Sequence, residues 1–98
     1  MIINKRTEGD KLVLSLVGRL DTNTSAELSK ELETSLDGIK SIVFDFTLLE
    51  YISSSGLRIL LSTQKRFREP GSMIVRNVSE LIMEIFEATG FDEILTIE

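Results

Sequence analysis

The spacing of apolar residues in this chain switches between the two periods that define strands and helices. From Lys11 to Val17, Leu12, Leu14 and Leu16 fall on one face, which is the two-residue period of a half-buried strand. Leu28, Leu32 and Leu36 then recur at helical spacing. A chain of 98 residues with both periods can bury the apolar face of its strands and that of its helices by packing the helices on a sheet. An α/β domain is predicted.

The first half of the chain is predicted to begin with a hairpin. Its first strand lies near Ile2 to Thr7, and the turn is at Glu8-Gly9-Asp10. Thr24 and Glu27 have the spacing of a capping box, so the first helix should begin there and end at Gly38. Ser41 to Phe46 has the composition of a central strand buried on both faces. Asp45 inside it would need a partner or a place near the exposed end of the strand.

The second half alternates between helix and strand in the same way. Leu57, Leu60, Leu61 and Phe67 form one helical stripe, and Pro70-Gly71 stops that helix. Ser79 is the expected cap of a third helix and Gly90 its end. The predicted elements are a helix over Gly56 to Arg68, a strand over Met73 to Val75, a helix from Ser79 to Gly90 and a short last strand over Ile94 to Ile97.

This order of elements predicts one domain over residues 1–98, because no linker, repeat or low-complexity tract divides the chain. The fold class is α/β, with a mixed β-sheet that starts as an antiparallel hairpin. Right-handed strand-helix-strand crossovers in the later part should place the helices mainly on one face.

The amino-acid composition argues against several classes of function. The chain has no cysteine and no histidine, so it lacks thiolate chemistry, the commonest general base and the commonest metal ligand. Catalysis, a metal site and a cofactor are therefore not expected. The net charge of −5 argues against nucleic-acid binding, and no apolar run approaches the roughly 20 residues of a membrane span. We expect a cytoplasmic protein.

Functional residues in such sheets lie where strands end and helices begin. Two segments qualify: Gly18 to Asp21, and Tyr51 to Leu57 with its three adjacent serines. One serine can be a plain helix cap. However, the start of this helix holds Gly56 and Arg58 and no acid, which leaves its N-terminus free to accept a phosphate. Asp21 would be a like charge beside that phosphate, although a turn or capping role is equally compatible with the sequence.

These segments together resemble the STAS domain of anti-sigma factor antagonists. The resemblance rests on Gly18-Arg19-Leu20-Asp21 after a strand, on Ile42 to Phe46 as the next strand, and on Tyr51 to Arg58 opening a helix. It covers nearly the whole chain in the same order.

The resemblance implies partner switching. The unphosphorylated protein would bind an anti-sigma factor that is also a serine kinase and so free the sigma factor. Phosphorylation would break the complex, and a serine phosphatase would restore it. The family's modified serine maps onto Ser54, with Ser53 as the alternative because it stands where many relatives have an aspartate. The expected partner-binding residues are Asp21, Ser53, Ser54, Ser55, Gly56, Leu57 and Arg58.

A second interpretation uses the same fold differently. The domain could be a structural or regulatory STAS subunit of a transporter or of a stressosome-like assembly. Catalysis by Asp21 and Ser54 is the least favoured interpretation, since no base or phosphate-cradling motif is present.

Overall fold

The sheet has four strands in the order β1-β2-β3-β4. The computed structural model describes all residues 1–98. β1 pairs with β2 antiparallel, whereas β2, β3 and β4 are parallel. The mixed sheet with an N-terminal hairpin is thereby confirmed. The strands are β1 (Ile2–Glu8), β2 (Lys11–Leu20), β3 (Ser41–Ile52) and β4 (Met73–Arg76).

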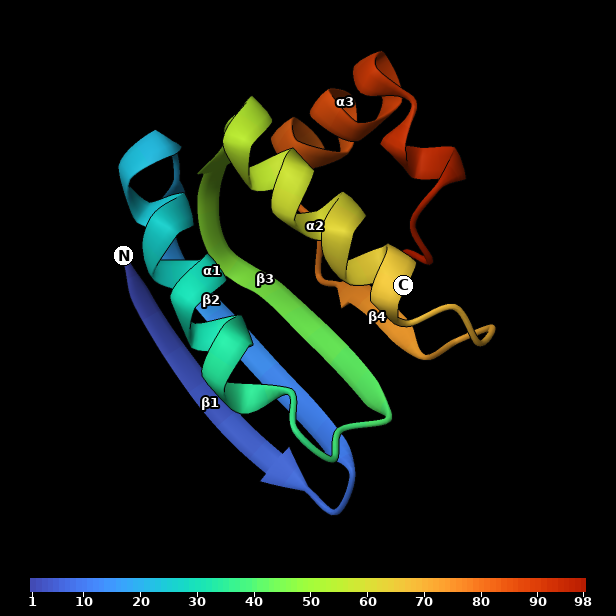
Figure 1. Ribbon diagram of the computed structural model, residues 1–98. Helices are drawn as coiled ribbons and strands as arrows, with labels where there is room; N and C mark the ends of the chain where they lie inside the picture. The colour runs from blue at the N-terminus through green and yellow to red at the C-terminus, as the bar shows by residue number, and fades with distance from the viewer.

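The helices lie mainly on one side of this sheet. α1 (Thr22–Ser35) and α2 (Ser54–Arg66) cover the same face, as Figure 1 shows. Two successive parallel crossovers of the same hand, stepping in the same direction across a sheet, must place their helices together. α3 (Glu80–Thr89) follows β4 and packs against β3. The opposite face of the sheet carries neither α1 nor α2.

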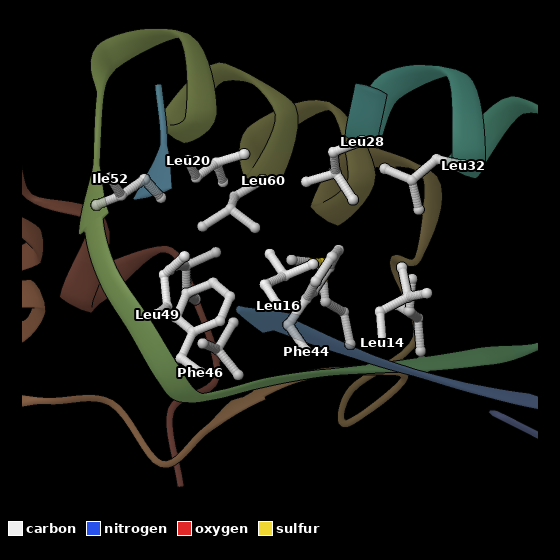
Figure 2. Close-up of a cluster of buried hydrophobic side chains, with 14 of the residues drawn as sticks. Leu14, Leu16, Leu20, Leu28, Leu32, Phe44, Phe46, Leu49, Ile52 and Leu60 are labelled. Carbon is white, nitrogen blue, oxygen red and sulfur yellow. The ribbon is translucent and has the colours of Figure 1, made fainter. Parts of the chain in front are cut away.

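The core fills the space between the sheet and α1 and α2 (Figure 2). Leu12, Leu14 and Leu16 are all fully buried, so the alternation in the sequence identified the inward face of β2 correctly. Leu28 and Leu60 face them from the helices and are fully buried too. Burying one such side chain contributes about 1.5 to 3 kcal/mol. Helix and sheet are therefore held together by one continuous core.

β3 is longer than the sequence indicated. The strand was expected to end at Phe46, but it continues to Ile52. The pairing with β2 shifts register between Asp45 and Leu48, which is the mark of a bulge. Because the bulge absorbs one residue, β3 resumes pairing at the exposed Leu48, which is in register with Val17. The segment expected as a loop is thus strand, and α2 starts directly after it.

Asp45 has the partners that its position demands. Its Oδ1 accepts the Thr47 backbone N–H at 3.0 Å, the Thr47 hydroxyl at 2.6 Å and the Asn77 amide at 3.0 Å. Partial burial opposes ionisation, but these hydrogen bonds outweigh it and hold the pKa of Asp45 below its usual value. The expectation of a partnered aspartate is confirmed.

The end of the chain departs from the prediction. The strand expected over Ile94 to Ile97 is wrong: a 3₁₀ helix, η1 (Phe91–Glu93), comes first, and only a single bridge joins Ile97 to Val75. The Val75 N–H donates to the Thr96 carbonyl at 2.9 Å, and the Glu98 N–H donates to the Val75 carbonyl at 2.9 Å. β4 has only four residues, so it offers a neighbour little length to pair with.

Candidate functional site

The ends of β2 and β3 meet at one edge of the sheet. Leu20 is in register with Ile52, and the Ser53 N–H donates to the Leu20 carbonyl at 2.8 Å. The next residues along each strand are Asp21 and Ser53, and each caps a helix. The two helix starts therefore lie next to each other at this edge. The parallel sheet does bring the Asp21 turn beside the serine segment.

Asp21 is the N-cap of α1. Its carboxylate accepts the backbone N–H groups of Asn23 and Thr24, both at 3.0 Å, and the Asp21 N–H donates to the Thr24 hydroxyl at 2.8 Å. The predicted capping box of Thr24 with Glu27 is therefore wrong by one turn. β2 runs to Leu20, so the helix begins immediately after it. The Thr24 backbone bond is the main cause that lowers the pKa of Asp21, which favours its charged form.

The three serines have different roles. Ser53 is the N-cap of α2, and its hydroxyl accepts the Gly56 N–H at 3.3 Å. Ser54 is the first helical residue and is exposed, whereas Ser55 is half-buried. α2 therefore begins at Ser54 and not at Gly56 as predicted. Of the three hydroxyls, that of Ser54 is the one presented to solvent while its neighbour holds the cap.

Gly56 allows α2 to start this close to the strands. A Cβ at this position would lie 2.8 Å from Ile52 Cγ1, 2.8 Å from Leu20 Cγ and 2.9 Å from Leu20 Cδ2. Leu57 is 7% exposed and belongs to the core. Gly56 and Leu57 were expected among the partner-binding residues, but they are buried. They support the site from beneath, and Ser54 and Arg58 are its exposed members.

The charges around the serines favour an anion. The first turn of α2 has no acidic residue, and its last turn has Lys65 and Arg66. The positive end of the helix dipole is thus left without a carboxylate. Arg58 is exposed four residues after Ser54, one helical turn further on. An anionic group on Ser54 would lie at the positive end of the α2 dipole, with Arg58 on the next turn of the same helix.

Arg19 and Tyr51 form a pair that sequence reasoning missed. They are in register at the ends of β2 and β3, and the Arg19 guanidinium lies 4.4 Å from the centre of the Tyr51 ring. Such cation–π contacts contribute roughly 0.5 to 1 kcal/mol at exposed sites. The signal was present, since Arg19 precedes Asp21 by the same two residues that separate Tyr51 from Ser53. Aligning the two strand ends would have paired them.

The site is a surface at two helix starts. None of the three hollows in the molecular surface includes Asp21 or Ser54. No cluster of three or more acidic, histidine or cysteine side chains suited to a metal ion is found. No helix has both the length and the apolar character needed to cross a membrane. The arrangement suits the docking of a protein surface and the holding of a phosphate.

The fold and the two helix starts define a small α/β domain with an exposed serine at the first position of a helix. The family model of the STAS domain matches residues 2–98. The chain belongs to the STAS domain family.

Relatives and solved structures agree with this assignment. A putative anti-sigma factor antagonist, BtrV of Bordetella bronchiseptica, is 33% identical over 82 residues, which cover 82% of this chain and 71% of the relative. The anti-sigma-B factor antagonist of Listeria monocytogenes is 26% identical over 97 residues, 96% of this chain and 84% of the relative.

The solved structures support the fold. Unphosphorylated SpoIIAA, an anti-sigma factor antagonist, superposes with a TM-score of 0.83 at 19% identity, covering 99% of this chain and 88% of SpoIIAA. A putative anti-sigma factor antagonist from Thermotoga maritima gives a TM-score of 0.87 at 17% identity, covering 97% of this chain and 84% of that one.

Proposed function

We propose that this protein is an anti-sigma factor antagonist without catalytic activity, switched by phosphorylation of Ser54. Its unphosphorylated form binds a kinase-type anti-sigma factor and frees the sigma factor. A serine phosphatase reverses the modification. The relatives named as antagonists support the general role. The position of Ser54 supports the switch.

The main support for the proposal is that two adjacent serines, Ser53 and Ser54, have different structural roles. The Ser53 hydroxyl holds the cap of α2, so modifying it would disturb the helix start. The Ser54 side chain is exposed at the first helical position, so it can be modified without loss of that cap. A phosphate there adds about −1.5 to −2 charges and is favoured by the helix N-terminus. We therefore expect phosphorylation of Ser54 to leave the fold intact and to alter the surface that a partner contacts.

The docking surface combines the Asp21 turn with the start of α2. Asp21 keeps its negative charge, and phosphorylation would add a second anionic group beside it. A partner that packs acidic or apolar groups closely against Ser54 would then meet the bulk and the negative charge of the phosphate. Like-charge juxtaposition in an interface costs several kcal/mol, enough to dissociate a micromolar complex. Gly56 and Leu57 act by holding the serine in place.

The test is binding of the anti-sigma factor encoded by the same genome, measured by isothermal titration. Ser54→Asp should weaken binding at least about 100-fold, a loss of about 2.7 kcal/mol, whereas Ser54→Ala should bind like the wild type. Ser62→Asp is a matched control, because Ser62 is also exposed on α2 but lies two turns away. Binding by Ser54→Asp within threefold of the control would refute the switch.

Mass spectrometry of the protein purified from its own cells tests the site. A single phosphate mapped to Ser54, and absent from Ser54→Ala, supports the proposal. Phosphate on Ser53 would keep the mechanism and move the site. An unmodified protein that also fails to bind the anti-sigma factor would favour the alternative function, a structural subunit of a transporter or a stressosome-like assembly.

A further inference from the structure

A row of apolar side chains, two of them exposed and the middle one half-buried, crosses the sheet on the face opposite α1 and α2. Ile2, Val17 and Leu48 are in register across β1, β2 and β3. Residues in register share a face, and neighbouring Leu16 is fully buried in the core, so this row points the other way. Ile2 is 59% exposed and Leu48 is 60% exposed. These two are the most exposed large apolar residues of the chain.

The rest of this open face alternates between polar and apolar rows. Asn4, Ser15, Asp45 and Arg76 follow the first row in register, and a second apolar row comes after them. A shallow hollow lies beside Leu48, where the bulge interrupts the pairing of β2 and β3. The second apolar row consists of Val13, Val43 and Ile74; Val13 and Val43 are buried, at 7% and 2% exposure, and Ile74 is half-buried, so the exposed apolar surface of this face is that of the first row.

The charge of this face differs from that of the whole protein. Its outward positions carry Arg6, Lys11 and Arg76 against Glu8 and Asp45, so the face is close to neutral. The chain as a whole carries −5, and the excess negative charge therefore lies on its other surfaces. Two copies therefore repel one another when their negatively charged surfaces face each other. Two open sheet faces, which are close to neutral, do not repel one another. A twofold arrangement also lets acids of one copy meet bases of the other.

The size of the face sets the strength of such a contact. Four strands about 4.8 Å apart, with about 8 residues of about 3.3 Å each, give roughly 500 Å² per copy. Stable interfaces bury roughly 800 Å² per partner. We propose that the open sheet face is a self-association surface on which a second copy packs in a weak symmetric dimer centred on Leu48 and Val17.

This inference is independent of the proposed switch. Asp21 and Ser54 belong to the starts of the helices that cover the other face, so the dimer leaves the docking site free. Variants at the sheet face and variants at Ser54 thus report on separate properties. Failure of one proposal leaves the other standing.

The test is a concentration series from about 10 µM to about 1 mM, a range that brackets dissociation constants of weak contacts. Sedimentation velocity should show a growing dimer fraction, and amide chemical shifts should move at the outward positions of β1, β2 and β3. Leu48→Asp should weaken dimerisation at least about tenfold, since it buries a charge without a partner.

Leu81→Asp is the matched control. Leu81 is 51% exposed on α3, so the variant adds the same charge at a leucine of similar exposure away from the sheet. It should dimerise like the wild type. A wild-type protein that stays monomeric at the highest concentration would overturn the proposal. So would equal effects of the two variants, or shifts confined to α2 or α3.

Discussion

Substituting Gly56 by Ala tests how tightly α2 is seated on the strand ends. The new methyl carbon would lie 2.8 Å from both Ile52 Cγ1 and Leu20 Cγ, whereas ordinary contact between such atoms begins at about 3.4 Å. Both neighbours are buried, at 2% and 0% exposure, and have little room to move. Accommodation therefore requires the helix start to shift by several tenths of an ångström.

The size of the effect follows from two opposing contributions. Inserting a methyl group into a packed core costs about 1 to 3 kcal/mol. Replacing Gly by Ala inside a helix recovers up to about 1 kcal/mol, and less in the first turn. A net loss of about 1 to 2 kcal/mol is expected, which for a domain of this size lowers the Tm by roughly 4 to 15 °C.

Urea unfolding followed by far-ultraviolet circular dichroism measures this loss. Ser55→Ala is the matched control, because it changes the preceding residue of the same turn without adding an atom near Leu20 or Ile52. Its stability should stay within about 0.5 kcal/mol of the wild type. The Gly56→Ala protein should also bind the anti-sigma factor less well, since Ser54 moves with the helix start.

A double-mutant cycle distinguishes overpacking from other causes. Leu20→Ala alone should cost about 2 to 5 kcal/mol, but less when combined with Gly56→Ala, because the removed side chain makes room for the new methyl group. Strict additivity, or a Gly56→Ala protein more stable than the wild type, would refute the close packing inferred at this position.

Two further predictions concern the helix caps. Ser53→Ala should destabilise the fold by about 1 kcal/mol through loss of the α2 cap, whereas Ser54→Ala should be nearly neutral; equal effects in urea unfolding would contradict the assignment of Ser53 as the cap. Hydrogen bonds, chiefly from Thr24, place the folded pKa of Asp21 below its unfolded value, so its contribution to stability is present above the unfolded pKa of about 3.9 and is lost as pH falls through the folded value. Asp21→Asn keeps a capping side chain and should show a flatter loss of stability below about pH 4 than the wild type.

The fold was largely accessible from the sequence because its elements are strongly periodic. The leucines of β2 and the capped start of α3 specify their elements without help from distant residues. The length of β3, in contrast, could not be predicted from the sequence. Thr47 and Leu48 break the alternation with exposed side chains, and only pairing with β2 across a bulge keeps them in the strand.

The adjacency of the two strand ends was predicted correctly, but the arrangement of their residues required the structure. Strand order brought Asp21 beside the serines, as the sequence had suggested. Which serine caps the helix depends on where β3 ends, and that position depends on the bulge. The burial of Gly56 and Leu57 likewise follows from the fit between α2 and two strand ends, a tertiary contact that local sequence does not encode.

The placement of Ser54 within a hydrogen-bonded helical turn bears on how an enzyme would reach it. The Ser53 carbonyl accepts the Leu57 N–H at 2.9 Å, and the turn is pinned to the strands at Gly56. An enzyme that threads its substrate as an extended peptide would have to unwind this turn first. A kinase acting on Ser54 would therefore have to recognise the folded domain. A synthetic peptide with the same residues would be a poor substrate, and searches for linear recognition motifs would overlook the site.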